Sequence, residues 1–253
     1  MLGYLQTFWE QFNWAGLLTA VQQLLGVLLC LTVHETCHGL AAYALGDPTA
    51  KAMHRLSFNP LHHIDWLGLA AMLVCGFGWA KPVPIYPYNF HKYRKGLFLT
   101  AIAGVVANYI IAFIAYPLFL LIAVYAAPTA SAAVYVVNFF EQVFYLIFAY
   151  SLSVAVFNLL PFYPLDGFRV VESLTREINP VRRFLKDYGR YILLILVLES
   201  FLCDILSTHT SLPYVHYFDI LGYVHWFARN IIGFPITAMW NAIFGLPIQL
   251  MPF

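Results

Sequence analysis

The sequence predicts an all-α polytopic membrane protein with about five to six transmembrane helices and a small re-entrant β element. The first observation is composition, because 62% of the 253 residues are hydrophobic and only 10% are charged. A soluble globular protein is closer to about half apolar and about a quarter charged. The second observation is that long apolar stretches alternate with loops that carry nearly all of the lysine and arginine. Both observations indicate a chain that lies in a lipid bilayer.

The length fits a single transmembrane domain over residues 1–253, with a core at 17–206 and a C-terminal hydrophobic segment at 207–253. The net charge of +1 predicts no nucleic-acid partner. The four cysteines are scattered without a CxxC pair, so we interpret them as packing residues rather than as disulfides or zinc ligands. Residues 1–13 lack the basic start of a signal peptide, and their aromatic side chains predict an interfacial lead-in.

The first transmembrane helix is predicted over residues 17–45, a mostly apolar stretch. Gly46, Asp47 and Pro48 end it, since glycine caps helices at their C-terminus and proline cannot continue them. At about 1.5 Å per residue the helix is roughly 40 Å long, which exceeds the thickness of a bilayer core. We therefore expect this helix to tilt or to protrude from the membrane.

The distribution of lysine and arginine predicts the orientation of the spans. No basic residue precedes Lys51. Apart from Arg229, the basic residues fall into three loops: Lys51 and Arg55; Lys81, Lys92, Arg94 and Lys95; and Arg169, Arg176, Arg182, Arg183, Lys186 and Arg190. If these loops are cytoplasmic, the N-terminus lies outside and the first span runs inward.

The remaining segments are placed from their length, their proline content and the basic loops that flank them. Residues 64–78 are too short for a simple span and are predicted to be re-entrant, and the prolines of residues 79–87 favour an extended edge strand. Further spans are predicted at residues 97–126, running outward, 133–160, running inward, and 191–206, running outward. Residues 217–250 are apolar but are interrupted by glycine and proline, so their number of spans is left open.

One polar motif, His34-Glu35-Thr36-Cys37-His38, lies within the first predicted span. Residues four apart share a face of a helix, so His34 and His38 can hold one metal ion. Neutral imidazoles suit Zn²⁺, and Glu35 beside them can take a proton from an attacking water, as in the HExxH motif of metalloproteases. Ionisable side chains inside an apolar span are costly and functional by default, which favours a metal site over a chance match.

Asp166 is the candidate for the third metal ligand. A site of this type needs a third protein ligand and one open position. Pro161 and Pro164 end the inward-running span just before this residue. The predicted topology then brings the carboxylate to the same side of the membrane as the two histidines. The alternative is an ordinary helix end with an aspartate at the surface.

Several motifs together resemble the site-2 protease family of intramembrane zinc metalloproteases, and in particular its minimal prokaryotic members without a PDZ or CBS domain. The resemblance covers roughly residues 25–175, and the chain beyond about residue 195 carries no motif of the family. The motifs are HExxH at 34–38, Gly-Trp-Ala-Lys-Pro-Val-Pro at 78–84, Ala103-Gly104 with Asn108, Asn-x-x-Pro-x-x-Pro-Leu-Asp-Gly at 158–167, and two shorter stretches at 46–50 and 59–65.

The resemblance implies that one zinc ion is bound by His34, His38 and Asp166. It implies that Glu35 is the general base and that Asn158 contacts the substrate or the transition state. It also implies a multi-pass protein of a prokaryotic plasma membrane, with its active site toward the cytoplasmic side and a transmembrane protein as substrate.

Two positions depart from the family pattern. Val105 follows Gly104 where the family usually has proline, and Trp66 follows Asp65 where proline is common. Neither position touches a ligand, so the departures concern the local backbone shape rather than the metal site.

A transmembrane helix offers no free carbonyl to a protease, because its backbone groups are bonded internally. The substrate must therefore unwind locally, and the extended segment 79–87 could pair with it as an added strand; the alternative is a packed loop. Asn158 could donate to the developing oxyanion, or it could cap the end of its helix. Asn108 lies in mid-span and needs a partner, so we expect it to link helices rather than to take part in catalysis.

The leading hypothesis is an intramembrane zinc endopeptidase that cleaves a transmembrane segment of a membrane protein near the cytoplasmic leaflet. A metal-binding membrane transporter is the alternative from another class, and a catalytically dead scaffold is a third. A transporter needs polar residues in both leaflets, whereas the ionisable residues within these spans lie almost all in the inner half. The intact Glu35 speaks against a dead scaffold. The sequence names neither the substrate nor the oligomeric state.

Overall fold

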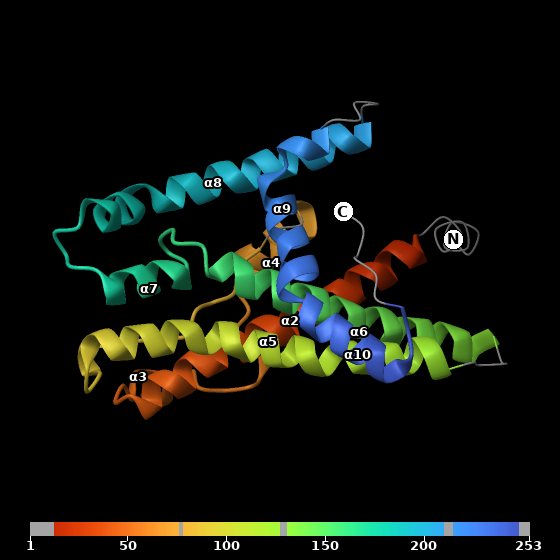
Figure 1. The fold of residues 1–253 in the computed structure, drawn as a ribbon, viewed down its shortest axis with the longest axis horizontal. Coiled ribbons are helices and arrows are strands. Elements are labelled where there is room, and N and C mark those ends of the chain that lie inside the picture. The colour runs from red at the N-terminus through yellow and green to blue at the C-terminus, as the bar shows by residue number, and fades with distance from the viewer. Residues whose placement is uncertain (1–12, 76–77, 127–130, 210–214, 248–253) are drawn as a thin grey trace, which may run out of the picture.

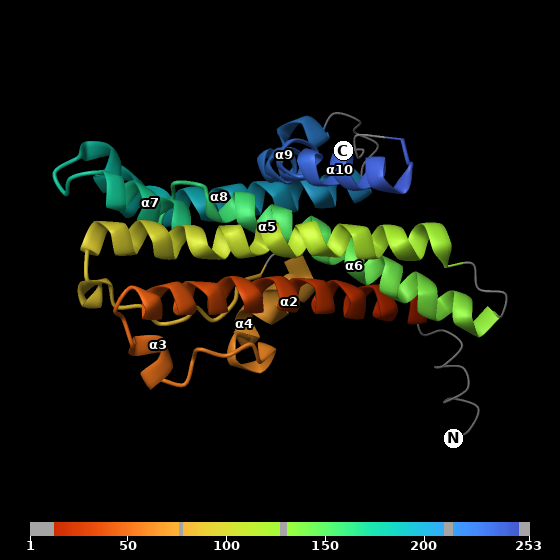
Figure 2. The same ribbon diagram turned by 60° about the horizontal axis from the view of Figure 1, so that its bottom comes forward.

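The computed structural model of the chain describes residues 13–75, 78–126, 131–209 and 215–247, so that most of the predicted lead-in at 1–13 lies outside the described residues. Within the described part, three helices are long and apolar enough to cross a membrane: α2 (Trp14–Ala44), α5 (Tyr93–Tyr125) and α6 (Ser131–Asn158). They pack lengthwise against one another and form the centre of the molecule (Figures 1 and 2). This arrangement fits the predicted class, an all-α membrane protein.

The three helices agree with the predicted spans at 17–45, 97–126 and 133–160, and each begins two to four residues earlier. The side chain of Asn13 caps the start of α2 by accepting a hydrogen bond from the Gly16 backbone N–H. After α2, Gly46 has a φ of +108°, a backbone conformation that glycine adopts readily. A Cβ atom at this position would also lie 2.4 Å from the ring of His91, so both the backbone conformation and the available space favour glycine directly after the end of α2.

α5 is the central helix of the bundle, in contact with α2, α6 and α7. Small side chains along α5 let its neighbours approach closely. The buried ones are Gly96, Ala101, Gly104, Ala107, Ala112 and Ala115. The main apolar core lies where α5 and α6 meet the C-terminal helices, around Phe148, Leu152 and Ile236, and these side chains are almost completely buried.

Between α2 and α5 the chain forms a lobe of short elements, namely α3 (Thr49–Ala52), η1 (Pro60–His62), α4 (Trp66–Cys75) and η2 (Pro87–Asn89). α3 and α4 project from the side of α2 (Figure 2). The predicted re-entrant segment 64–78 contains α4, which is a helix of 10 residues. The structure does not confirm the small β element predicted here, since the described residues of this lobe form no strand and hold one isolated antiparallel bridge, between Ile64 and Ala80. The three prolines of residues 79–87 explain this, because proline cannot donate to a ladder.

Asp47 joins the end of α2 to the chain that leads into α5. Its side chain is completely buried, at 0% exposure. Its carboxylate accepts hydrogen bonds from the Tyr86 backbone N–H at 2.7 Å, from Asn89 Nδ2 at 2.8 Å and from the Thr49 backbone N–H at 3.1 Å. Burial by itself raises the pKa of this carboxyl, but the hydrogen bonds outweigh it and hold the pKa below its ordinary value of 3.8.

After α6 come α7 (Asp166–Leu174), α8 (Pro180–His209), η3 (Val215–Phe218), α9 (Ile220–Phe227), η4 (Ala228–Ile232) and α10 (Phe234–Phe244). α8 runs along one side of the bundle (Figures 1 and 2). It contains the predicted span 191–206 but begins earlier, where Asn179 caps it and Arg182 pairs with Glu172 of α7. Short helices replace a continuous span in the described part of residues 217–250, so the total number of spans stays a prediction.

The hydrogen bonds of Asp47 predict a pH-dependent contribution to stability. The folded-state pKa lies below the unfolded value, so the contribution is complete above pH 3.8 and is lost as the pH falls through the folded pKa. Replacing Asp47 by Asn should lower the free energy of unfolding by about 1.5–3 kcal/mol at neutral pH, and this difference from wild type should shrink as the pH falls below 3.8. Thermal unfolding in detergent, followed by tryptophan fluorescence, measures both.

The exposed residue Glu177 offers a matched control, because Glu177→Gln removes a carboxylate that lies at the surface. This variant should unfold like wild type at every pH. A gap between Asp47→Asn and wild type that stays constant from neutral to acid pH would contradict the assigned role of the ionised carboxylate.

Candidate active site

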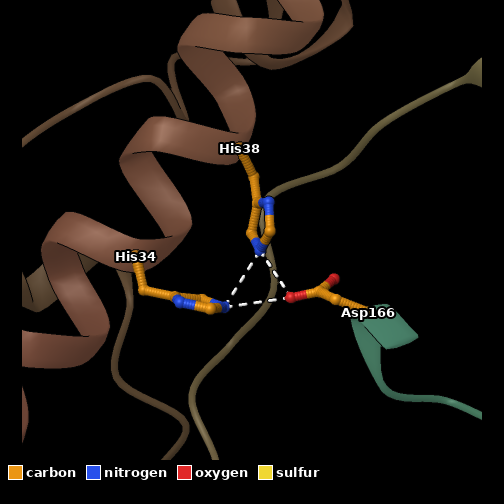
Figure 3. Close-up of side chains that lie close together, drawn as sticks. All are labelled: His34, His38 and Asp166. Carbon is orange, nitrogen blue, oxygen red and sulfur yellow. Dashed lines mark hydrogen bonds and ion pairs between the residues drawn. The ribbon is translucent and has the colours of Figure 1, made fainter. Parts of the chain in front are cut away.

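His34 and His38 lie one helical turn apart on the same face of α2. Both residues are buried, with 2% and 3% of their surface exposed. Their Nε2 atoms are 3.0 Å apart and point toward a common centre (Figure 3). Helix periodicity alone therefore brings the first two predicted ligands together.

Asp166, the first residue of α7, completes this group (Figure 3). Its Oδ2 atom lies 3.1 Å from His34 Nε2 and 2.8 Å from His38 Nε2. The three ligand atoms lie within 4.8 Å of one another, and the carboxylate is buried as well. Two imidazole nitrogens and one carboxylate oxygen are a donor set that suits Zn²⁺ with a fourth position left open. These three side chains could hold one metal ion.

A sharp turn between α6 and α7 places Asp166 in this group. Pro161 and Pro164 lie in the turn and keep α6 from continuing. A Cβ atom at Gly167 would lie 2.2 Å from the carbonyl oxygen of Leu159, so only glycine lets α7 begin directly against the end of α6. The proline and glycine residues around Asp166 are thus explained by the steric requirements of the turn between α6 and α7.

One face of α5 covers the two histidines. His38 Nδ1 donates to the backbone carbonyl oxygen of Thr100 at 2.7 Å, and Nδ2 of Asn108 lies 3.2 Å from His34 Nδ1. Gly104, midway between them, makes room for both rings, since a Cβ atom there would lie 2.6 Å from His38 Nε2. Histidines that bind zinc almost always use the other ring nitrogen for such a hydrogen bond. The residues around the group therefore fit a zinc site.

The Asp166 carboxylate is held in its charged form. Burial by itself raises the pKa of this carboxyl, but hydrogen bonds from His34 and His38 and the attraction of their rings outweigh burial. The pKa therefore lies well below its usual range, and the carboxylate is in the form that binds a cation. Arg169, one turn further along α7, places Nη1 3.8 Å from the other carboxylate oxygen, Oδ1.

Glu35 is half-buried, and its Oε2 atom accepts a hydrogen bond from the backbone N–H of Val83 at 2.8 Å. Val83 stands between Pro82 and Pro84, which have no N–H, so it carries the one backbone donor of this tripeptide. Arg55 donates from Nη2 to the carbonyl oxygens of the two residues before Val83, at 3.1 and 3.2 Å. The extended segment therefore holds the carboxylate of Glu35 and is itself held by the lobe.

Asn158, the remaining predicted site residue, is the last residue of α6. Its Nδ2 atom donates to the backbone carbonyl oxygen of Val154 at 3.0 Å, which is a bond within its own helix. This agrees with the capping alternative, and the contact with substrate stays a prediction.

Sequence reasoning missed several partners of the site. The Thr100 carbonyl and the Val83 N–H are main-chain groups, so the type of residue at these positions does not predict that they contact the site. Asn108 is polar in the middle of an apolar span, and that signal predicts a partner without saying which one. The structure assigns it to His34.

Comparisons with known proteins agree with this geometry. The model of the family described as Peptidase family M50 matches residues 22–199, a range that contains all three candidate metal ligands. The chain is 37% identical over 171 residues to "Putative zinc metalloprotease YwhC" of Bacillus subtilis (strain 168), and the match covers 67% of this chain and 77% of that protein. No solved structure matches the chain significantly.

The close approach at Gly104 predicts that Gly104→Ala weakens zinc binding. The new Cβ atom would lie 2.6 Å from His38 Nε2 and 2.7 Å from His34 Cε1, so one ring must leave its position. We expect zinc affinity to fall by at least the roughly 10–100-fold that loss of an orienting contact costs. Zinc titration against a chelator, with the protein in detergent, measures the effect.

Gly26→Ala is the control for this variant, because Gly26 is a buried glycine of α2 against Leu146, where a Cβ atom meets a side-chain carbon at 3.2 Å. It should lower thermal stability and leave zinc affinity unchanged. Wild-type zinc affinity in Gly104→Ala would show that the rings have more room than this geometry allows.

The assignment of Asp166 predicts that Asp166→Ala loses zinc. The variant lacks the only acidic member of the group, so its zinc affinity should fall by more than the roughly 10–100-fold cost of an outer-shell partner. Metal analysis after gel filtration checks this, with Asp187→Ala as a control, since Asp187 is an exposed carboxylate of α8. Full zinc content in Asp166→Ala would remove Asp166 from the set of ligands.

Proposed function

This chain belongs to peptidase family M50 and is a zinc metallopeptidase, and from that premise we propose that it is an intramembrane endopeptidase. Its substrate is a transmembrane segment of a membrane protein, cleaved near the cytoplasmic leaflet. One observation carries the proposal: in the buried group of His34, His38 and Asp166, both histidines belong to α2, a helix long and apolar enough to span a membrane.

In this proposal His34, His38 and Asp166 would hold the zinc ion. When bound there, the ion would supply Lewis acidity, which would polarise a peptide carbonyl and lower the pKa of a water molecule. Glu35 takes the proton from the attacking water and passes it to the leaving amine. Because the Val83 N–H occupies Oε2, we assign this proton transfer to Oε1.

A substrate helix must unwind before cleavage, since its carbonyl groups are bonded internally. The extended segment 79–87 is a candidate surface for binding the unwound substrate. The backbone N–H groups of Lys81, Val83 and Tyr86 are already bonded within the protein, and three prolines of this segment have none. These contacts support the packed-loop alternative, so a substrate strand would meet mainly carbonyl acceptors here.

The proposed orientation places the N-terminus outside a prokaryotic plasma membrane and the active site toward the cytoplasm. The end of α2, the start of α5, and α7 lie at one end of the bundle (Figures 1 and 2). The basic residues in and around these segments support a cytoplasmic location for that end, and they include Lys51, Arg55, Lys92, Lys95 and Arg169.

The experiment that tests the proposed function compares wild type with Glu35→Gln on a model transmembrane substrate in detergent. Glutamine cannot accept the proton, so we expect cleavage to fall by about 10²–10⁴-fold while about one zinc per chain is retained. Cys37→Ala, two residues further along α2, is the control and should cleave like wild type. Cleavage by Glu35→Gln at the wild-type rate would contradict the proposed protease mechanism. Zinc binding without cleavage by any variant would favour a metal-binding transporter or a catalytically dead scaffold.

A further inference from the structure

Asn108 lies in the middle of α5, and its side chain is completely buried, at 0% exposure. Its Nδ2 atom is 3.2 Å from Nδ1 of His34. Its Oδ1 atom is buried and, among the described residues, lacks a hydrogen-bond partner. An amide oxygen without a partner is costly in an apolar bundle, so its position beside a candidate zinc ligand calls for a physical explanation.

The chemistry of a ligand histidine supplies this explanation. An imidazole that binds zinc through Nε2 carries its proton on Nδ1, and this N–H needs an acceptor. An amide Nδ2 is a donor only and cannot accept. Rotation of the Asn108 amide by about 180° exchanges Nδ2 and Oδ1 at nearly the same place. The amide oxygen then accepts the hydrogen bond from the Nδ1–H of His34, and Nδ2 takes the buried place that Oδ1 had. The rotation therefore replaces a donor that faces a donor by an acceptor.

We propose that Asn108 is the positioning residue of His34, with its Oδ1 accepting from the Nδ1–H of this ring and directing Nε2 at the metal. The inference rests on the proposed function, because it takes His34 to be a zinc ligand. It changes the sequence-based expectation for Asn108 from a link between helices to a role in metal binding.

The neighbouring ligand supports this assignment, because it is oriented in the same way by the same helix. His38 donates from Nδ1 to the Thr100 carbonyl oxygen at 2.7 Å. Thr100, Gly104 and Asn108 are spaced four residues apart, so they lie on one face of α5. That face supplies an acceptor for each histidine and, at Gly104, the space for both rings. Only Asn108 acts through its side chain, so a substitution can remove its contribution.

The competing explanation is that Asn108 only links α2 and α5 by donating from Nδ2. The two explanations differ in the atom that matters. An ionised aspartate at this position can accept but cannot donate, whereas leucine has a similar volume and can do neither. Asn108→Asp should therefore rescue zinc binding only if the acceptor is the important atom.

The test measures the zinc dissociation constant of the full chain in detergent, by competition with a chelator, for wild type, Asn108→Leu and Asn108→Asp. We expect zinc affinity to fall by about 10–100-fold in Asn108→Leu and to stay close to wild type in Asn108→Asp. The same proteins loaded with Co²⁺ report ligand geometry through their visible absorption bands. These bands should shift in the leucine variant and keep their positions in the aspartate variant.

Two further variants separate the outcomes. Asn241→Leu removes a buried asparagine of α10 that bonds to Tyr116 and Pro247, and it should lower thermal stability without changing zinc affinity. His34→Ala tests the ligand itself. If His34→Ala loses zinc but Asn108→Leu binds it like wild type, or Asn108→Asp binds it as weakly as Asn108→Leu, the role of Asn108 is overturned. If His34→Ala keeps wild-type zinc affinity, the ligand assignment of the proposed function fails instead.

Discussion

The need to pair polar atoms inside an apolar bundle governs the centre of this structure. His34, His38 and Asp166 lie between helices that offer them little water, where a polar group without a partner costs about 2–7 kcal/mol. The bundle meets this cost with its own groups, since Thr100 and Asn108 approach the rings from α5. These contacts are made only when α2, α5 and α7 pack in one register.

This register accounts for small residues that have no chemistry of their own. Gly104 lets α5 approach the two rings, and Gly167 lets α7 begin against the end of α6. A methyl group at either position would push apart the segments that carry the candidate metal ligands. The glycines are therefore as much a condition of the site as the three side chains themselves.

The lobe between α2 and α5 is connected to the site through Glu35. The Val83 N–H holds one oxygen of this carboxylate, Arg55 holds the carbonyl groups before Val83, and Asp47 holds the Tyr86 N–H at the end of the same segment. The prolines that prevent a β ladder also leave Val83 as the local donor. The segment thus serves to position the general base of the proposed reaction, which an edge strand with free hydrogen-bonding groups would not do.

The sequence by itself determined the class of protein and the two histidines of the site. Apolar composition and helical period depend on residues close together in the chain, so they can be recognised from the sequence without a structure. Asp166 follows only from the predicted topology together with the family resemblance, and the structure brings it to the histidines. The tertiary structure alone decided the partners at Thr100, Val83 and Asn108. Main-chain groups are the same in every residue, and no local pattern encodes the packing register of distant helices.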